Sequence, residues 1–341
     1  MRAVILTDSG LAAAHGLPEP LLEPGSVLVR VLGVGVCGTD LAVASGRREV
    51  PSHPWVMGHE AAGRVLEAGE GVTGIDVGDL VALEPNYVDR TCPACRNGTT
   101  AACANRRSAG ITVPGYMAEI VSVPQEFVWK APSGTSVEDL LCIEPLSVAA
   151  AAIRRSGIGA GATPLVLGAG AQGLFAVQVL CARGFQPRVV DLQQSRVQLA
   201  LELGARWPSD HETFTHIFDT TGAAAALDSA LSRLTRPGTV TIVGESAEPS
   251  GLSSQEIVHR QLTIHGSFIY DHPHDFAESM RLVADGTIKP SRILRHRSLL
   301  DHAASAIWES PQKTGKTWID FTAARAAGPS CREGSRQSHT R

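Results

Sequence analysis

The stretch from residue 164 to residue 181 constrains the fold of this chain more than any other segment. A short apolar run at 164–167 leads directly into the glycine-rich sequence Gly-Ala-Gly-Ala-Gln-Gly at 168–173, and a second apolar segment follows. This order predicts a strand, a tight turn and a helix. Such a unit can cradle a phosphate group, because the helix N-terminus offers free N–H groups and a partial positive charge.

The residues of this turn have separate predicted roles. Gly168 lets the chain turn sharply, Gly170 lets the backbone approach a pyrophosphate, and Gly173 lets the helix pack close to the strand. Gln172 lies in the same turn, and we expect it at the cofactor. Asp191 ends the next apolar run, at about the spacing expected for an acidic residue that binds an adenosine ribose. The alternatives are an ordinary turn without a ligand and a helix N-cap role for Asp191.

Length and composition limit the classes of protein that fit. The 341 residues are too many for one typical hydrophobic core, so we expect two domains. The net charge of −4 gives no reason to expect nucleic acid or an anionic membrane as a partner. The first six residues resemble a strand rather than a signal peptide. Three of the seven cysteines lie at metal-like spacing, which suits a reducing compartment, so we expect a cytoplasmic protein.

The pattern of predicted elements changes along the chain. Short strands dominate the first part, and a long helical stretch begins at Cys142. After Asp191 helices and strands alternate, which predicts a doubly wound parallel sheet. The expected domains are 1–146 and 147–287, with 288–322 returning to the first domain and 323–341 forming a disordered tail. The elements expected after Asp191 are helices at 197–203 and 223–234 and strands at 216–219, 239–243 and 261–267.

Two groups of residues are candidate metal ligands. Cys37, His59, Glu60 and Glu144 offer a thiolate, an imidazole and two carboxylates, a set that suits zinc. Each also has a structural explanation, since cysteine is often a small buried hydrophobe and a lone histidine is usually structural. The second group lies in the long loop from 85 to 110, and such loops are uncommon unless something staples them or they serve a function. Its members are Asp89, Cys92, Cys95 and Cys103, separated by two, two and seven residues.

These motifs, in this order and at these distances, resemble the zinc-dependent medium-chain dehydrogenases. The sorbitol and polyol branch, with the related glucose dehydrogenases, looks nearest, and the resemblance covers about residues 1–322. It implies an α/β protein with a GroES-like, mostly β catalytic domain and a doubly wound Rossmann cofactor domain. The motifs are Cys-Gly-Thr-Asp at 37–40, Gly-His-Glu at 58–60, the cysteine-rich loop, Glu-Pro-Leu at 144–146, the glycine turn and Asp191.

The resemblance implies a role for each ligand-type residue. Cys37 and His59 would bind a catalytic zinc directly, and Glu60 and Glu144 would supply the remaining contacts, directly or through water. Asp40 would orient His59. In the loop, the family usually has four cysteines, so Asp89 would be an unusual ligand of a structural zinc. A degenerate loop without metal is the alternative.

The same resemblance extends to the proton path and the cofactor. Thr39 would receive the hydroxyl proton of the substrate, although many relatives have a histidine three residues later, where this chain has Ala42. Asp191 favours NAD over NADP, because its carboxylate accepts hydrogen bonds from a 2′-hydroxyl and repels a 2′-phosphate. Arg196 could weaken this preference. The residues expected to line the adenosine and nicotinamide ends are Thr220, Ser267 and Phe268.

The expected substrate is a small polyhydroxylated molecule. Asn86 and Glu119 offer hydrogen-bonding groups in segments that look like the sugar pocket of glucose dehydrogenases. The expected reaction is hydride transfer from a secondary alcohol of a polyol, cyclitol or sugar to NAD, which gives a ketone or lactone. A zinc-free reductase of the same fold and a non-catalytic dinucleotide-binding protein are the alternatives. By the resemblance we also expect a homodimer or homotetramer.

Overall fold

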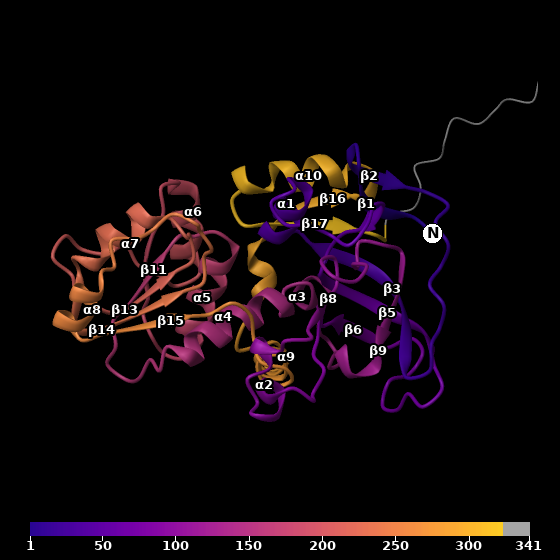
Figure 1. Cartoon of the computed structure of the whole chain (residues 1–341), viewed down its shortest axis with the longest axis horizontal. Helices are drawn as coiled ribbons and strands as arrows, with labels where there is room; N and C mark the ends of the chain where they lie inside the picture. The colour runs from indigo at the N-terminus through magenta and orange to yellow at the C-terminus, as the bar shows by residue number, and fades with distance from the viewer. Residues whose placement is uncertain (323–341) are drawn as a thin grey trace, which may run out of the picture.

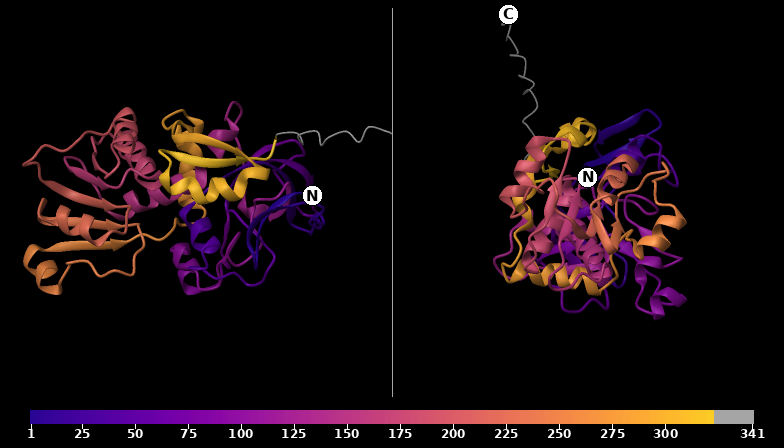
Figure 2. Two further views of the ribbon diagram at one scale, coloured as in Figure 1. Left: turned by 90° about the horizontal axis from the view of Figure 1, so that it is seen from above. Right: turned by 90° about the vertical axis from the view of Figure 1, so that its left-hand side faces the viewer.

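The computed structural model describes residues 1–322, and the tail predicted at 323–341 lies outside the described residues. The described chain forms two halves joined by helix α4 (Ile143–Arg155), as Figure 1 shows. One half is built mostly of antiparallel strands, and the other holds a parallel sheet flanked by helices. The two further views of Figure 2 show the C-terminal segment, in yellow, lying with the antiparallel half.

The antiparallel half is organised around strand β3 (Ser26–Gly35). Val27, Val29 and Val31 of this strand are buried and Arg30 is exposed, because alternate side chains of a strand point to opposite faces. The order of the seven-stranded sheet is β10-β6-β5-β3-β17-β16, and β9 also pairs with β3. The other strands of this half are β1 (Ala3–Thr7), β2 (Gly10–Ala14), β4 (Trp55–Val56), β5 (Glu60–Ala68), β6 (Leu80–Leu83), β7 (Asn86–Tyr87), β8 (Arg107–Ser108), β9 (Ile120–Pro124), β10 (Val128–Lys130), β16 (Leu294–Leu299) and β17 (Lys316–Asp320).

The end of the described chain completes this sheet. Strand β17 pairs antiparallel with the last residues of β3, so that Trp318 lies opposite Gly35 and Asp320 opposite Gly33. Strand β16 pairs in parallel with β17. The helices of this half are α1 (Gly38–Ala44), α2 (Pro93–Arg96), α3 (Val137–Leu140) and α10 (Ala303–Glu309), with 3₁₀ turns η1 (Thr100–Ala102), η2 (Gln125–Phe127), η3 (Pro290–Ile293), η4 (Leu300–His302) and η5 (Ser310–Gln312).

The second half is a five-stranded, wholly parallel sheet with the order β12-β11-β13-β14-β15, which confirms the predicted doubly wound class. The last residues of its strands are register partners in one row: Val190, Leu167, Asp219, Ile242 and Gly266. Ligands of such sheets bind beyond this carboxyl edge. The elements are β11 (Pro164–Leu167), α5 (Ala171–Ala182), β12 (Arg188–Val190), α6 (Gln194–Glu202), β13 (Phe214–Asp219), α7 (Ala224–Leu231), β14 (Leu234–Ile242), α8 (Ser254–Arg260), β15 (Leu262–Gly266) and α9 (His274–Ala284).

Two predicted boundaries are wrong at the same place. The helix expected at 223–234 ends at Leu231. The strand expected at 239–243 already begins at Leu234, which pairs with Phe214 of β13. An apolar leucine fits the buried face of a helix or of a strand equally well, so the sequence pattern alone does not separate the two. None of the helices in residues 1–322 is long and apolar enough to cross a membrane.

Helix α4 brings the two cores together. Its residues Leu146 and Ile153 pack in the core that also holds Phe175 of α5. Ile143 of the same helix packs in a different cluster, which includes Trp318 of β17. Because the helix is buried on both sides, Glu144 in its first turn lies between the antiparallel half and the cofactor half.

Candidate active site

The structure brings Cys37, His59 and Glu60 together where β3 ends and the antiparallel strand β5 begins. One ligand atom from each of these residues lies within 4.8 Å of the others. Cys37 is the N-cap of α1, and His59 directly precedes β5, so both are fixed by regular backbone. Gly35 lies opposite Glu60 in the sheet, and a Cβ atom there would stand 2.2 Å from Oε2 of Glu60. The glycine therefore leaves the space that this carboxylate occupies.

Asp40 organises the first two ligand residues. Its Oδ2 accepts a hydrogen bond of 2.8 Å from the backbone N–H of Cys37, and its Oδ1 lies 3.7 Å from Nδ1 of His59. Burial opposes a positive charge on His59, but the Cys37 thiol and the Asp40 carboxyl raise its pKa well above the ordinary value. The surroundings of the imidazole are thus strongly negative, as a cation site requires.

Lys316 is a buried member of this site that the sequence analysis missed. Its Nζ lies 2.5 Å from Oε2 of Glu60 and donates to the carbonyl oxygen of Val36 at 2.9 Å. Burial alone would lower the pKa of Lys316, but the Glu60 carboxylate raises it above its ordinary value. Lysine and glutamate are almost never fully buried unless paired, and this rule is the only sequence-level signal for the contact.

Glu144 is buried nearby but does not belong to the group of ligand atoms within 4.8 Å. Burial raises its pKa to about 8, with His59 acting in the opposite direction and Glu60 in the same one. The Oε1 atom of Glu60 is buried and has no hydrogen-bond partner among residues 1–322. An orphaned carboxylate oxygen beside a thiol and an imidazole fits a zinc ion, which binds sulfur, nitrogen and oxygen ligands.

Thr39 lies in the first turn of helix α1, two residues after the N-cap residue Cys37. Thr39 is the second residue of α1 and is half-buried. Its side chain makes no hydrogen bond with residues 1–322. The position three residues later is Ala42, so no imidazole follows Thr39 on this helix.

The four candidate ligands of the loop also converge. One atom each of Asp89, Cys92, Cys95 and Cys103 lies within 4.8 Å of the others. Asp89 is held by the backbone N–H groups of Thr91 and Cys92 and by the Asn105 amide. These hydrogen bonds lower the pKa of Asp89, whereas burial and then the neighbouring thiols raise the pKa of Cys95 to about 12. Three sulfurs and one charged oxygen fit a tetrahedral zinc site. We call residues 89–103 the cysteine lobe.

The glycine turn has the geometry that a dinucleotide needs. Gly168 has a φ of +89°, and a Cβ atom at Gly173 would lie 1.9 Å from the Gly168 carbonyl oxygen. At Gly170, the N-cap of α5, an added Cβ would meet nothing within 4 Å, so open space lies in front of this backbone. Asp191 Oδ2 accepts a hydrogen bond of 2.7 Å from the backbone N–H of Ala169, which places the acidic residue beside the turn. Gln172 Oε1 has no partner among residues 1–322.

The other predicted cofactor residues are placed differently. Thr220 donates its hydroxyl to the Leu167 carbonyl oxygen at 2.8 Å, so it supports the turn. Ser267 follows β15 and accepts a hydrogen bond of 3.0 Å from Arg155. Arg196 donates to the carbonyl oxygens of Pro311 and Lys313, beyond the sheet. Because the Arg196 guanidinium binds these carbonyl groups, Asp191 is the charged residue beside the glycine turn.

The structure separates the two predicted substrate residues. Asn86 is buried, donates to the Tyr270 hydroxyl at 3.0 Å and accepts from the Ser108 hydroxyl at 2.8 Å. Both oxygens of Glu119 instead accept hydrogen bonds from Arg2, at 2.6 Å from its backbone N–H and 2.7 Å from Nε. Glu119 thus joins the chain's first residues to the sheet, and we leave it out of the substrate site.

A buried polar network connects Glu84, which follows β6, with the loop after β15 and with the cysteine lobe. Glu84 is completely buried, and its Oε2 accepts from Nε1 of Trp129 at 2.7 Å and lies 2.9 Å from Nδ1 of His272. Thr100 exchanges two hydrogen bonds with the backbone of His272, at 2.6 and 3.1 Å. The loop after β15 therefore rests on the lobe.

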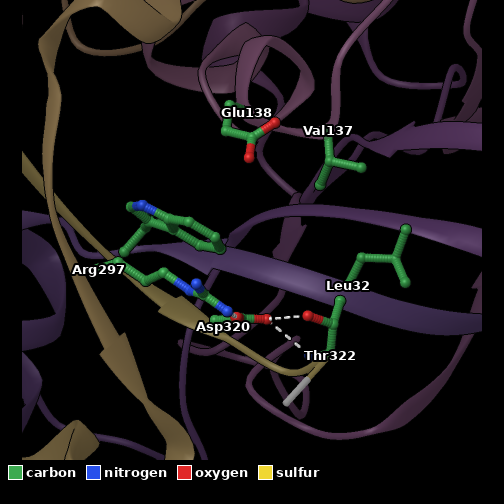
Figure 3. Close-up of a pocket in the computed structure, with 7 residues that line it drawn as sticks. Leu32, Val137, Glu138, Arg297, Asp320 and Thr322 are labelled. Atoms are coloured by element: carbon green, nitrogen blue, oxygen red, sulfur yellow. Dashed lines mark hydrogen bonds and ion pairs between the residues drawn. The ribbon is translucent and has the colours of Figure 1, made fainter.

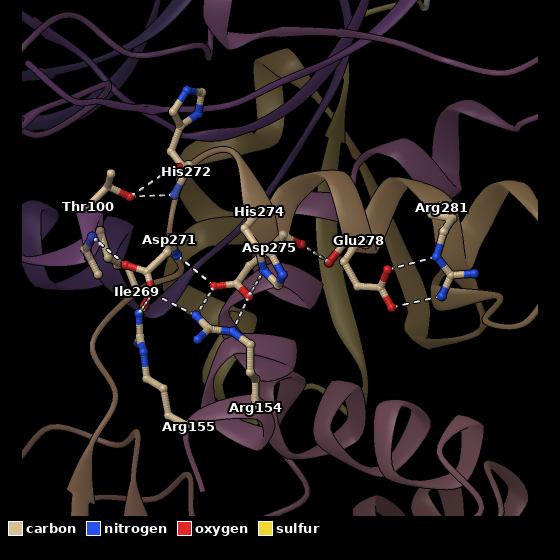
Figure 4. Close-up of polar contacts among 12 residues, drawn as sticks. Thr100, Arg154, Arg155, Ile269, Asp271, His272, His274, Asp275, Glu278 and Arg281 are labelled. Carbon is tan, nitrogen blue, oxygen red and sulfur yellow. Dashed lines mark hydrogen bonds and ion pairs between the residues drawn. The ribbon is translucent and has the colours of Figure 1, made fainter. Parts of the chain in front are cut away.

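Charged residues of α4 hold the same loop from the other side. Arg155 lies 2.8 Å from Asp271, and Arg154 binds Asp271 at 2.7 Å and Asp275 at 2.8 Å, as Figure 4 shows. The backbone N–H of Ala101 also donates to Asp271, at 2.9 Å. The lobe, the cofactor loop and α4 are thus one connected unit.

A surface pocket of about 240 Å³ lies apart from all these groups. It is formed where β17 ends, and Arg297 pairs there with Asp320, whose Oδ1 accepts hydrogen bonds from Thr322 (Figure 3). None of its lining residues is a predicted site residue. We therefore assign the chemistry to the site of Cys37, His59 and Glu60 and not to this pocket.

Taken together, the sheet edge and the metal-type ligands define a zinc-type, dinucleotide-dependent oxidoreductase. The family model "Alcohol dehydrogenase GroES-like domain" matches residues 23–133, and the model "Zinc-binding dehydrogenase" matches residues 171–285. The chain belongs to the zinc-dependent medium-chain dehydrogenase family, which confirms the resemblance inferred from the motifs.

Individual relatives extend over most of the chain. It is 31% identical over 320 residues to L-threonine 3-dehydrogenase of Pyrococcus horikoshii, which covers 87% of this chain and 91% of the relative. It is 31% identical over 293 residues to L-galactonate-5-dehydrogenase of Escherichia coli, covering 82% and 86%. The structure of an alcohol dehydrogenase from Escherichia coli CFT073, solved with NADH, matches with a TM-score of 0.86 at 27% identity, covering 94% of this chain and 99% of that one.

Proposed function

We propose that this protein oxidises a secondary alcohol of a small polyhydroxylated substrate with NAD, using a zinc ion held by Cys37, His59 and Glu60. The observation that carries the proposal is the convergence of these ligand atoms within 4.8 Å. Glu144 completes the set, through water or by a change of rotamer, since it lies outside that distance in this structure. The galactonate dehydrogenase among the relatives acts on a polyhydroxylated compound and supports the substrate class.

A zinc ion held by these residues would polarise the alcohol as a Lewis acid, and bound NAD would provide the hydride acceptor. The residues of the chain do the rest. Asp40 holds the Cys37 backbone and faces His59, which fixes the orientation of both ligands. Thr39 takes the hydroxyl proton, because it lies two residues after Cys37 and its hydroxyl has no hydrogen-bond partner among residues 1–322. Ala42 provides no next acceptor, so the proton leaves to water or to the cofactor ribose.

NAD rather than NADP is the proposed cofactor. The Asp191 carboxylate lies beside the glycine turn, and Arg196 is occupied by main-chain carbonyl groups. A 2′-phosphate would therefore meet a negative charge without a nearby compensating arginine. The cysteine lobe is proposed to hold a second, structural zinc. A homodimer or homotetramer is proposed as the assembly, because β15 is a sheet edge able to pair with another chain.

A metal-exchange experiment tests the proposed function. Zinc content and NAD reduction by alditols, cyclitols, aldoses and aldonates should be measured for the wild type, for Cys37→Ser and for His59→Ala. We expect one zinc fewer and no turnover in both variants, with unchanged NADH binding. Full activity of a verified zinc-free protein would contradict the proposal and favour a zinc-free reductase of the same fold.

A further inference from the structure

Thr100 joins the cysteine lobe to the loop that follows β15. It is the first residue of the 3₁₀ turn η1 and is buried, with 6% of its surface accessible. Its hydroxyl oxygen accepts a hydrogen bond of 2.6 Å from the backbone N–H of His272 and donates one of 3.1 Å to the His272 carbonyl oxygen (Figure 4). Because buried backbone groups need partners, one hydroxyl group fixes both polar backbone groups of a residue 172 positions away in the sequence.

Two neighbouring contacts connect the same two segments. The backbone N–H of Ala101 donates to Oδ1 of Asp271 at 2.9 Å. Arg106 donates to the Ala101 carbonyl oxygen at 2.6 Å, and its guanidinium carbon lies 5.1 Å from the centroid of the Phe268 ring. The turn η1 and Arg106 therefore support the loop 267–272 at several of its residues.

The same loop has other supports. Arg155 of α4 donates to the Ser267 hydroxyl at 3.0 Å and also to the Ile269 carbonyl oxygen. Glu84 and Asn86 of the antiparallel half bind side chains of the loop. Helix α4 thus holds the start of the loop, and Thr100 holds the backbone at its end. We therefore expect loss of the Thr100 contact to displace the loop without unfolding it.

The turn η1 ends at a candidate metal ligand. Cys103 is the C-cap of η1, and its backbone N–H donates to the Thr100 carbonyl oxygen at 3.0 Å. The sulfur of Cys103 is one of the four ligand atoms of the cysteine lobe that lie within 4.8 Å of one another. A zinc ion in the lobe would hold Cys103 and, through this short turn, the position of the Thr100 hydroxyl.

The loop 267–272 begins at the end of the parallel sheet where the nicotinamide half of the cofactor should lie. Asp191 follows β12 and the glycine turn follows β11, so the adenosine and the pyrophosphate belong to these two strands. The other half of NAD then extends along the carboxyl edge, over β13 and β14 toward β15. Ser267 directly follows β15, and its N–H donates to the carbonyl oxygen of Ile242, the last residue of β14, at 2.9 Å.

We propose that Thr100 is a positioning residue for the nicotinamide end of NAD, and that the cysteine lobe influences hydride transfer through it. The Thr100 hydroxyl fixes the backbone of His272, and this backbone fixes the loop 267–272 beside the nicotinamide ring. A displacement of about 1 Å from the reactive geometry can cost about 100-fold in rate, so a contact outside the site can control the reaction. This inference rests on the proposed NAD-dependent oxidation and gives the cysteine lobe a role in it.

The test compares two ligands that differ at this end of the cofactor, since NADH contains the nicotinamide ring and ADP-ribose lacks it. Their dissociation constants are measured by calorimetry in the wild type, in Thr100→Val and Thr100→Ala, which remove the hydroxyl, and in Thr100→Ser, which retains it. Loss of the two hydrogen bonds should raise the NADH dissociation constant by about 5- to 30-fold, with less than about a twofold change for ADP-ribose. Thr100→Ser should restore NADH binding to within about threefold of the wild type.

The rate of hydride transfer is the second measurement. In a single turnover at saturating NAD, with the best alcohol of the panel described above, Thr100→Val should lower this rate by about 10- to 100-fold. Zinc content should equal that of the wild type. A dissociation constant refers to folded molecules only, so partial unfolding of a variant would lower the calorimetric stoichiometry and not this value.

A double-variant cycle tests the contribution of the lobe. Asp89→Ala should lose the lobe zinc and weaken NADH binding while sparing ADP-ribose, as Thr100→Val does. In the Thr100→Val background, Asp89→Ala should add less than about threefold, because two changes that act through one contact are not additive. Strictly additive effects overturn the role of the lobe.

Thr99→Val is the matched control, because the neighbouring Thr99 is exposed and its hydroxyl donates to the Ala94 carbonyl oxygen inside the lobe, at 3.1 Å. It should leave both dissociation constants and the transfer rate unchanged. An unchanged ratio of the NADH and ADP-ribose dissociation constants in Thr100→Val overturns this inference and leaves the proposed function intact. An unchanged transfer rate likewise overturns it. Failure of the wild type to bind NADH overturns both proposals.

Discussion

A methyl group added at Gly170 or at Gly173 should have opposite effects, although the two glycines belong to one turn. A Cβ atom at Gly173 would lie 1.9 Å from the Gly168 carbonyl oxygen, so the strand and the helix must move apart. A Cβ atom at Gly170 would meet no protein atom within 4 Å, and the φ of −69° suits any residue. We therefore expect Gly173→Ala to damage the fold and Gly170→Ala to damage only cofactor binding.

The magnitudes separate the two variants clearly. Gly170→Ala reduces the entropy of the unfolded chain, which stabilises by about 0.4–1 kcal/mol, but alanine is a poorer N-cap by a similar amount. Its free energy of unfolding should thus change by less than about 0.5 kcal/mol. Gly173→Ala should lose about 1–3 kcal/mol through overpacking. For Gly170→Ala, the loss of one or more hydrogen bonds to the charged pyrophosphate should raise the NADH dissociation constant by about 10- to 100-fold.

The assay combines urea unfolding, followed by tryptophan fluorescence, with calorimetric titration of NADH. Zinc content serves as the control, since neither glycine lies in a candidate metal site. Unchanged NADH affinity in a stable Gly170→Ala variant would refute the reasoning, because the pyrophosphate would then not contact that backbone.

Three further predictions concern charged groups. Lys316→Met should cost about 3–5 kcal/mol of stability, because it leaves the buried Glu60 carboxylate unpaired; adding Glu60→Gln should recover part of this, and additive losses in the urea unfolding of the double variant would be inconsistent with direct coupling. Arg154→Met should cost about 3 kcal/mol at pH 7, measured by urea unfolding. Burial raises the pKa of Asp275, but hydrogen bonds from Arg154, from the Asp271 backbone and from His274 together more than offset this, so the folded value is lowered. The stabilisation is present above the unfolded pKa of about 3.9 and is lost as the pH falls through the folded value. A variant deficit that stayed constant down to about pH 2 would argue against this pairing. Metal analysis should find about two zinc ions per chain and about one in Asp89→Ala, while a wild type with one zinc and freely titratable lobe thiols would indicate a degenerate lobe.

Local and regularly spaced features of the fold were predictable from the sequence. The glycine turn, with Gly168 at a positive φ and Gly173 against the Gly168 carbonyl, follows from residues within one short segment. The cysteine lobe likewise depends on spacing, and its four ligand atoms do converge. Asp191 was predictable because one helix and one short strand, α5 and β12, separate it from the turn, and it lies beside the turn as expected. In each case the chain geometry limits the possible distances.

Contacts between distant residues were not predictable in this way. Lys316 reaches Glu60 because β17 pairs with β3, and the sequence around either residue gives no sign of this contact. Glu119 looked like a substrate ligand, yet it binds Arg2 through a pairing of the chain's first strand. Arg196 similarly reaches a carbonyl group of the last segment. Charged side chains can find partners anywhere in a fold, so residue type alone does not decide whether they serve a site or the scaffold.

Because β17 pairs with β3, the surroundings of the metal site are completed only late in the synthesis of the chain. During synthesis the residues Cys37, His59 and Glu60 leave the ribosome long before Lys316, which is only six residues from the end of the described range. Until β17 arrives, Gly33–Gly35 of β3 lack their neighbour on one side, and a bare strand edge invites pairing with other chains. A fragment limited to residues 1–146 would keep that edge and an uncompensated Glu60 permanently. The cofactor half, which lies between the two strands in the sequence, must therefore be made before the antiparallel half can close.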